Sequence, residues 1–232
     1  MREKIELRKQ VRALRDAASA EMRARWSAEI CARAMAHPAY VRARTVHIFL
    51  SFQSEVDTRA IIEHVQASGR RVVVPVFLKD SDETPATQID TLDLAAFDLG
   101  RWGMRTPKLR RDVLLDEIDL VFVPLLVWAP TDEGRCTRVG YGAGYYDRLL
   151  TRVRPHVPRI GLAFALQRVE RLPIETHDQM LDEVLHDSFV RNPTFVIRRS
   201  VTTQASRFSN AKHTIPSPER GRGRNSVFRG KY

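Results

Sequence analysis

The sequence is poor in cysteine and contains no long apolar run. Only two cysteines, Cys31 and Cys136, occur among 232 residues, and neither has a second cysteine or a histidine at metal-ligand spacing. This argues against a disulfide framework and against a zinc site, and we expect both as reduced thiols packed among apolar side chains. No run of about eighteen apolar residues is available to span a bilayer, and the first residues, MREKIELRKQ, lack an apolar signal core. We therefore expect a soluble, cytoplasmic protein that does not bind membranes.

Acidic residues are scarce at the end of the chain. The net charge is +10, but segment 199–232 carries eight basic side chains against Glu219 alone, which gives it +7 and leaves +3 on residues 1–198. The tail is rich in Ser, Thr, Asn, Arg, Gly and Pro, which predicts a disordered extension after a single domain of residues 1–198. A basic tail can bind RNA weakly, but an extension without function is the simpler interpretation. Nucleic acid is therefore not an expected partner, and the small excess on the domain suits an anionic substrate.

Apolar periodicity predicts alternating helices and strands. Within residues 4–18, Leu7, Val11, Leu14 and Ala18 recur at helical spacing. Further helices are predicted at 19–36, from about 58 and at 144–153, and strands at 45–51, 71–78, 87–92 as an edge strand, 119–124 and 159–164. A long loop is expected between residue 124 and the last helix. The pattern indicates a Rossmann-like α/β fold, an open and mostly parallel sheet with helices on both faces in a single domain, and we expect a monomer.

A glycine-rich stretch from Arg138 to Leu149, RVGYGAGYYDRL, is the most informative part of the chain. Glycines at every second position permit positive φ and let backbone N–H groups approach an anion. The helix that follows adds free N–H groups and a partial positive charge. Arg138 offers a planar guanidinium, and Asp147 offers a hard oxygen ligand for Mg²⁺. The stretch therefore predicts a phosphate-binding site.

The glycine spacing matches neither of the common nucleotide-binding motifs. It differs from GxGxxG, and no Lys-Ser or Lys-Thr follows the last glycine as a P-loop requires. The alternative is an ordinary glycine-rich turn that caps a helix. In that case Tyr145 and Tyr146 are core aromatic residues, and Asp147 is a first-turn acid favoured by the helix dipole.

Other charged residues are candidates by position. Lys4 and Arg8 project on one flank of the first helix, for which a solvated basic face is the alternative. Glu55 follows a predicted strand in a loop at the carboxyl end of the sheet, where ligands bind in open α/β folds, although a surface acid fits equally well. Asp178 and Asp182 follow the last predicted strand, which is able to return the chain to the same edge. Isolated acids are nevertheless most often surface residues.

Three segments together resemble a known family. They are Val123-Pro124-Leu125, RVGYGAGYYDRLL, and LPIETHDQMLDEVL from Leu172. The chain resembles the 5-formyltetrahydrofolate cyclo-ligases, also called methenyltetrahydrofolate synthetases, from Lys4 to about Phe195, and GYGAGYYDR is the most specific part. The resemblance implies a ligase of folate and one-carbon metabolism.

The resemblance also implies ligand-binding residues. The residues implied to bind ATP are Lys4, Arg8, Arg138, Val139, Gly140, Tyr141, Gly142, Ala143, Gly144, Tyr145 and Tyr146. Those implied to bind the folate are Leu50, Glu55, Trp102, Tyr141, Gly142, Ala143, Gly144 and Tyr145. Mg²⁺ is implied at Asp147 and Asp178, with Asp182 a weaker candidate, and catalytic roles fall on Arg138 and Tyr145.

Three further residues near these segments leave alternatives open. An indole at Trp102 is suited to stacking on the folate, but a partly buried structural tryptophan is equally compatible. Thr106 stands where the family is expected to carry Glu or Gln, so a polar contact there is in doubt. His177 is a candidate general base, although a hydrogen-bonded structural histidine is the preferred interpretation.

The implied reaction is an ATP- and Mg²⁺-dependent cyclisation of 5-formyltetrahydrofolate, with or without a polyglutamate tail, to 5,10-methenyltetrahydrofolate, with release of ADP and phosphate. Transfer of the γ-phosphoryl group to the formyl oxygen gives an iminophosphate, N10 attacks the activated carbon, and phosphate leaves. Such chemistry needs positioning and charge stabilisation rather than a protein nucleophile. The alternative is a non-catalytic folate- or nucleotide-binding protein of the same fold.

Overall fold

The computed structural model describes residues 2–78, 83–100 and 103–188. The predicted tail 199–232 and Trp102 lie outside the described residues, so both predictions stay open. Over the described ranges, no helix has the length and apolar character needed to cross a membrane.

The predicted helices form close to their expected bounds. The α-helices of the described chain are α1 (Arg2–Ala17), α2 (Ala20–Ala36), α3 (Pro38–Arg42), α4 (Arg59–Ala67) and α5 (Tyr145–Arg152), and short 3-10 helices are η1 (Leu94–Ala96), η3 (Leu115–Glu117) and η4 (Ala165–Gln167). Ser19 begins α2 as predicted, because its hydroxyl accepts a hydrogen bond from the N–H of Met22 at 3.1 Å. α2 ends before Pro38, whose fixed φ suits the first turn of α3.

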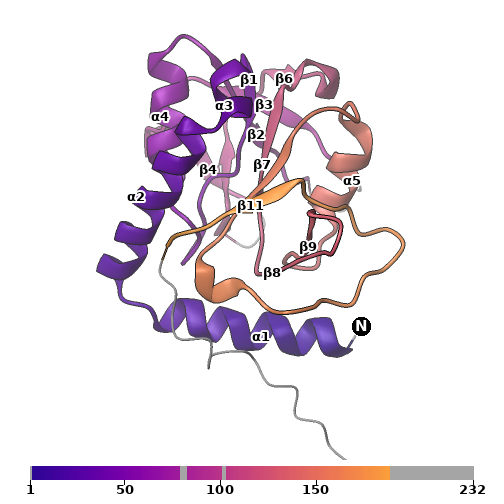
Figure 1. Ribbon diagram of the computed structural model, residues 1–232. Helices are drawn as coiled ribbons and strands as arrows, with labels where there is room; N and C mark the ends of the chain where they lie inside the picture. Colours follow the sequence, from indigo (N-terminus) through magenta and orange to yellow (C-terminus); the bar gives the residue numbers. More distant parts are fainter. Residues whose placement is uncertain (1, 79–82, 101–102, 189–232) are drawn as a thin grey trace, which may run out of the picture. The chain divides into compact units, whose positions relative to one another are not determined.

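The main sheet has the strand order β11-β10-β7-β1-β2-β3-β6 (Figure 1). Its strands are β1 (Thr45–His47), β2 (Arg71–Pro75), β3 (Ala86–Ile89), β6 (Asp112–Val113), β7 (Leu120–Pro124), β10 (Arg159–Leu162) and β11 (Glu183–Leu185). All pairs from β11 to β2 are parallel, whereas β3 runs antiparallel to β2 and β6 antiparallel to β3. The prediction of a mostly parallel α/β sheet is therefore confirmed.

Two details of the predicted strands are wrong. The segment 87–92 is not an edge strand, because β6 pairs with the outer side of β3. The predicted strand 45–51 is regular only over 45–47. Ile48 still donates its N–H to the carbonyl oxygen of Val73 at 2.9 Å, and Ile48 and Phe49 are both buried just beyond the end of β1.

The segment after β7 is a hairpin rather than the expected long loop. Strands β8 (Val127–Pro130) and β9 (Cys136–Val139) are antiparallel, with Trp128 opposite Arg138. Gly134 turns the chain between them at φ 77°. A second small hairpin is formed by β4 (Phe97–Leu99) and β5 (Arg105–Pro107). The β8-β9 hairpin matters for function because it leads directly into the glycine stretch.

Helices cover both faces of the sheet, and α1 lies across one end. Figure 1 shows α2 and α4 on one side of the strands and α5 on the other, with α1 running beneath β8 and β9. Val11 of α1 packs with Leu126, Val127 and Val139 in a small apolar cluster. The apolar stripe predicted on α1 therefore holds this helix against the hairpin, and its basic side chains come close to the glycine stretch.

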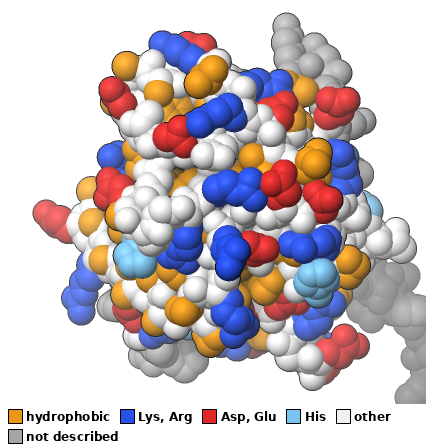
Figure 2. Space-filling model, turned by 90° about the horizontal axis from the view of Figure 1, so that it is seen from above, with side chains coloured by type: hydrophobic (Ala, Val, Ile, Leu, Met, Phe, Trp, Pro, Cys, Tyr) orange, Lys and Arg blue, Asp and Glu red, His pale blue; other side chains and the backbone are white. Residues whose placement is uncertain are grey.

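The opposite end of the molecule carries charges of mixed sign. Figure 2 views the molecule from above and shows Lys and Arg side chains interspersed with Asp and Glu. Arg71 pairs with Glu117 at 2.7 Å, and Arg154 pairs with Asp119 at 3.2 Å. Basic side chains of the described domain are thus partly neutralised in pairs, which agrees with its small charge excess.

Gly161 in β10 is enclosed by three apolar side chains. A Cβ at this position would lie 2.8 Å from Leu125 Cδ2, 2.8 Å from Leu181 Cδ1 and 2.9 Å from Val184 Cγ2. We expect Gly161→Ala to lower the free energy of unfolding by about 1–3 kcal/mol, because these close-packed neighbours must shift. Urea denaturation measures this change. Leu125→Ala removes one of these three close contacts, so the cost of Gly161→Ala should be smaller in that background, and an equal cost in both backgrounds would contradict the explanation.

Candidate functional site

A cavity of about 730 Å³ opens at the carboxyl ends of the parallel strands β1, β2 and β7. We call it the central cavity. Its volume falls within the range of small-molecule sites, and its place in the fold is the one where open α/β sheets bind ligands. Its walls come from α1, the segments after β1 and β2, the end of β7, residues 138–148, and the loop that carries Asp178. Apart from the weaker candidate Asp182, the predicted ligand-binding residues that the structure describes all line it: Lys4, Arg8, Leu50, Glu55, Arg138, Val139, Gly140, Tyr141, Gly142, Ala143, Gly144, Tyr145, Tyr146, Asp147 and Asp178.

Two of the three glycines in the glycine stretch have the positive φ that the sequence predicts, whereas Gly140 does not. Gly142 has φ 102° and Gly144 has φ 67°, which side chains with a Cβ rarely adopt. Gly144 is the N-cap of α5, so the helix begins at Tyr145 as expected. The first N–H groups of α5 therefore lie at the wall of the central cavity, where an anion is able to accept hydrogen bonds from them.

The two tyrosines of the stretch are core residues as well as cavity residues. Tyr145 is 6% exposed and Tyr146 is 7% exposed. The Tyr145 hydroxyl donates to the carbonyl oxygen of Pro85 at 2.9 Å, and burial raises the pKa of that hydroxyl. The alternative in which both tyrosines are core residues is thus correct for their packing, and both also line the central cavity. A catalytic role for Tyr145 stays a prediction, and in this structure its hydroxyl is engaged by the backbone.

α1 supplies three cations, Lys4, Arg8 and Arg12, to the cavity. Lys4 is only 6% exposed, so the solvated-flank alternative is wrong for this residue. Its Nζ lies 2.6 Å from Asp178 Oδ2 and 3.1 Å from Glu175 Oε2. Burial lowers the pKa of Lys4, but its hydrogen bonds to the two carboxylates outweigh burial and leave the pKa raised. Arg8 Nε donates to the carbonyl oxygen of Gly140 at 2.8 Å, which ties α1 to the glycine stretch.

Arg138 and Asp147 form a buried ion pair below the glycine stretch. Arg138 Nη2 donates to Asp147 Oδ1 at 2.7 Å, and the side chains are 4% and 23% exposed. Asp147 Oδ1 also accepts the N–H of Gln179 at 3.2 Å. Burial lowers the pKa of Arg138, and the charge of Asp147 opposes this effect. Among the described residues, Arg138 Nε has no hydrogen-bond partner, so the guanidinium keeps a donor that is not used within the protein.

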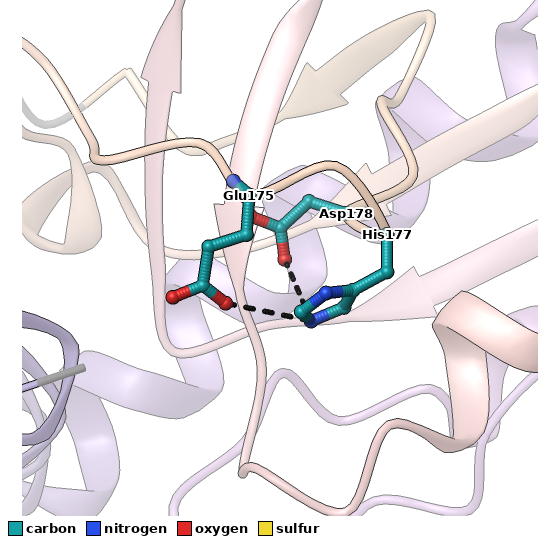
Figure 3. Close-up of side chains that lie close together, drawn as sticks. All are labelled: Glu175, His177 and Asp178. Atoms are coloured by element: carbon teal, nitrogen blue, oxygen red, sulfur yellow. Dashed lines mark hydrogen bonds and ion pairs between the residues drawn. The ribbon is translucent and has the colours of Figure 1, made fainter.

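Glu175, His177 and Asp178 gather at the cavity rim (Figure 3). His177 Nε2 lies 3.4 Å from Glu175 Oε2 and 3.9 Å from Asp178 Oδ1. Burial raises the pKa of Asp178, but the hydrogen bonds from Lys4 and from the N–H of Glu175, together with the charges of Lys4 and His177, outweigh burial and leave the pKa lowered. The ligand atoms of the three side chains lie within 4.8 Å of one another, so two carboxylates and an imidazole are able to bind one divalent cation together.

The structure sorts the other acidic candidates. Asp182 does not line the central cavity, because its Oδ2 accepts the N–H of Arg159 at 2.8 Å and its Oδ1 faces Arg135 at 3.5 Å. The sequence interpretation missed Glu175. The sequence feature that could have indicated it is the spacing Glu-x-His-Asp, which places two carboxylates and an imidazole within four residues.

The residues expected to face the folate also line the central cavity. Leu50 and Glu55 follow β1, and Glu55 Oε2 accepts the N–H of Phe52 at 2.9 Å. Burial raises the pKa of Glu55, although its hydrogen bond with Tyr141 works in the opposite direction. Phe77, which the sequence interpretation did not select, packs its ring 4.8 Å from that of Tyr145. These groups form an apolar wall with one carboxylate.

Thr106 lies away from this wall. It is paired with Asp98 in the β4-β5 hairpin and does not line the central cavity, whereas its neighbours Met104 and Arg105 do. Polar contact with a bound folate is therefore not expected from Thr106 itself.

Comparisons with known proteins agree on one family. Residues 1–187 match the model of the 5-formyltetrahydrofolate cyclo-ligase family. The chain is 31% identical to the 5-formyltetrahydrofolate cyclo-ligase of Mus musculus over 195 residues, which cover 79% of this chain and 91% of the mouse protein. It is 32% identical to that of Escherichia coli K12 over 183 residues, which cover 78% of this chain and 98% of the bacterial protein.

Solved structures give the same fold. An NMR structure of Aquifex aeolicus 5,10-methenyltetrahydrofolate synthetase superposes with a TM-score of 0.67 at 27% identity and covers 88% of this chain and 98% of its own. A 5,10-methenyltetrahydrofolate synthetase from Mycoplasma pneumoniae superposes with a TM-score of 0.61 at 23% identity, over 78% of this chain and 97% of its own.

Proposed function

The chain belongs to the 5-formyltetrahydrofolate cyclo-ligase family, and on that premise we propose that it converts 5-formyltetrahydrofolate to 5,10-methenyltetrahydrofolate with ATP and Mg²⁺, releasing ADP and phosphate. The observation that carries the proposal is the composition of the central cavity. Its lining combines cations and the first residues of α5 with the acids Glu175, Asp147 and Asp178, and with apolar side chains beside Glu55. A triphosphate, a divalent cation and a pterin need these three sets of groups side by side.

The phosphate-binding wall fits ATP. Arg138 has a donor with no partner among the described residues, although the side chain is buried. Gly142 opens the backbone at positive φ, and a Cβ there would approach the guanidinium of Arg8 at 3.6 Å. We propose that Lys4, Arg8 and Arg138 neutralise phosphate charge and that backbone N–H groups of the glycine stretch bind phosphate oxygens.

The acids at the rim fit Mg²⁺. Asp147 and Asp178 both line the central cavity with carboxylate oxygens, the ligand type that Mg²⁺ prefers, and we propose that they bind it. Glu175 and His177 adjoin Asp178 and are available as further ligands. In this structure Asp178 is paired with Lys4, so we propose that Lys4 turns from the carboxylate towards phosphate when the metal binds.

The reaction divides between ATP and the protein. ATP supplies the phosphoryl group that turns the formyl oxygen into a leaving group. The protein orients N10 towards the formyl carbon, excludes water and stabilises the developing charge, which are the means by which phosphoryl transfer is catalysed. We propose that Arg138 stabilises charge on the transferred group and that Tyr145 packs beside the formyl group, while Leu50 and Glu55 hold the pterin. A carboxylate at Glu55 is suited to accept hydrogen bonds from the amino and N–H groups of a pterin.

Absorbance at the methenyltetrahydrofolate band tests the proposal directly. Purified protein is mixed with 5-formyltetrahydrofolate, ATP and Mg²⁺, and parallel reactions omit one component at a time. We expect absorbance to rise only in the complete mixture, with ADP formed in equal amount. Folate binding without a rise in absorbance or formation of ADP would instead support a non-catalytic binding protein.

A further inference from the structure

Arg15 is a buried cation that the proposed mechanism does not use. It lies on α1 and is 1% exposed, so its charge is removed from water. Its Nε donates to Ser54 Oγ at 2.9 Å, and its Nη2 donates to the hydroxyl oxygen of Tyr141 at 3.0 Å. Ser54 in turn hydrogen-bonds Asp16. Burying a charged guanidinium costs desolvation free energy. The residues next to Arg15 on α1 are exposed or half-buried, so we expect its burial to serve a specific purpose.

Tyr141 connects Arg15 to the predicted folate wall. The Tyr141 hydroxyl, which accepts from Arg15, interacts with the Glu55 carboxylate and lowers its pKa, and Ser54, the other partner of Arg15, directly precedes Glu55. The Tyr141 ring is also covered by a second guanidinium, since Arg12 Cζ lies 5.5 Å from its centroid. The contacts Arg15 to Tyr141 to Glu55 therefore join α1, the glycine stretch and the loop after β1, which are far apart in sequence.

The orientation of Glu55 depends on these contacts. One carboxylate oxygen accepts the N–H of Phe52, and Tyr141 supplies a further hydrogen bond. The charges of Arg15 and Arg12 favour the ionised carboxylate in a place where burial opposes it. Without Arg15, the Tyr141 hydroxyl loses its donor, and Glu55 loses a nearby positive charge.

We propose that Arg15 is a positioning residue that acts through Tyr141 to hold Glu55 in the orientation and charge state that bind the pterin. This inference rests on the proposed function, because it deepens the assignment of Glu55. The larger effect is expected on the folate, because Glu55 is assigned to the folate alone and Arg8 holds the backbone of the glycine stretch independently through the Gly140 carbonyl. ATP binding therefore does not depend on Arg15 in the same way.

Separate measurement of the two ligands tests the proposal. Arg15→Met keeps most of the side-chain volume and removes the charge and both hydrogen bonds. We expect its Kd and KM for 5-formyltetrahydrofolate to rise by about tenfold or more, the loss typical of a charged hydrogen bond. The Kd for ATP and the kcat at saturating folate should stay within about twofold, since the phosphate-binding wall is unchanged. Arg15→Lys keeps the charge and one hydrogen bond, and it should recover part of the folate affinity.

Two further variants separate positioning from folding. Tyr141→Phe removes only the hydroxyl, so it should weaken folate binding, and the double variant with Arg15→Met should be no worse than the more affected single variant. Lys9→Met is the matched control, because Lys9 is exposed on the same helix, and its folate KM should equal that of the wild type. An unchanged folate KM in Arg15→Met, additive effects in the double variant, or equal losses for folate and ATP would overturn the proposal. Failure of the wild type to form product would instead refute the proposed function.

Discussion

Replacing Arg138 with methionine is expected to lower kcat by about 10²- to 10³-fold, the loss typical of removing one preorganised donor that stabilises transition-state charge. The side chain is buried in the wall of the central cavity, held in one orientation by Asp147, and its Nε has no partner among the described residues. A cation fixed in this way needs no reorganisation when charge develops on the transferred phosphoryl group. Steady-state kinetics with ATP and 5-formyltetrahydrofolate measure the loss.

Two variants control this experiment. Arg138→Lys keeps a point charge but loses the planar fork, so kcat should recover only in part. Arg152→Met removes the same charge from the end of α5, where Arg152 bonds Thr84 away from the central cavity, and its kcat should equal that of the wild type. Wild-type kcat in Arg138→Met would exclude the assignment of Arg138 to the transferred phosphoryl group.

Asp147→Asn is expected to lower kcat on the order of a hundredfold and to raise the Mg²⁺ concentration needed for half-maximal rate, because a metal ligand supplies several kcal/mol of charge stabilisation. Asparagine keeps an oxygen that accepts from Arg138 and from the N–H of Gln179, the two contacts of Asp147 Oδ1. The fold should therefore be retained. The rate as a function of Mg²⁺ concentration, together with Mn²⁺ binding followed by electron paramagnetic resonance, measures both effects.

The choice of asparagine follows from the ion pair. Asp147→Ala leaves the Arg138 charge buried without its partner, a change that costs about 3–5 kcal/mol of stability, so loss of activity in that variant has two causes. Asp182→Asn is the matched control, since Asp182 lies outside the central cavity, and its Mg²⁺ dependence should be normal. If Asp147→Asn binds Mn²⁺ as tightly as the wild type, the metal assignment to Asp147 is wrong.

The candidate site was predicted largely because its residues lie in short, recognisable segments. Gly142 and Gly144 have the positive φ that their spacing predicts, and α5 starts at Tyr145. Lys4 and Asp178 were assigned separately to phosphate and to metal, and the sequence did not predict their contact at 2.6 Å. A contact between residues 174 positions apart depends on how α1 packs on the β8-β9 hairpin, and local periodicity holds no information about that packing.

Arg15 shows the same limit more clearly. On the helical wheel it belongs to the basic flank with Lys4, Arg8 and Arg12, a position compatible with solvent exposure. In the structure it is 1% exposed and bonded to Ser54 and Tyr141. Helical spacing defines which side chains share a face, but only the elements packed against that face determine whether a charge is solvated or paired.

The sequence by itself determined the α/β class, the helix that begins at Ser19, the positive φ of Gly142 and Gly144, and the family. These features depend on capping, on backbone freedom and on apolar periodicity, which act over a few residues. The tertiary structure decided that β3 is covered by β6, that a hairpin precedes the glycine stretch, and that Glu175 joins Asp178 beside Lys4. Each of these features is a contact between segments that are distant in sequence. The burial and charge pairing that stabilise such contacts exist only in the folded chain.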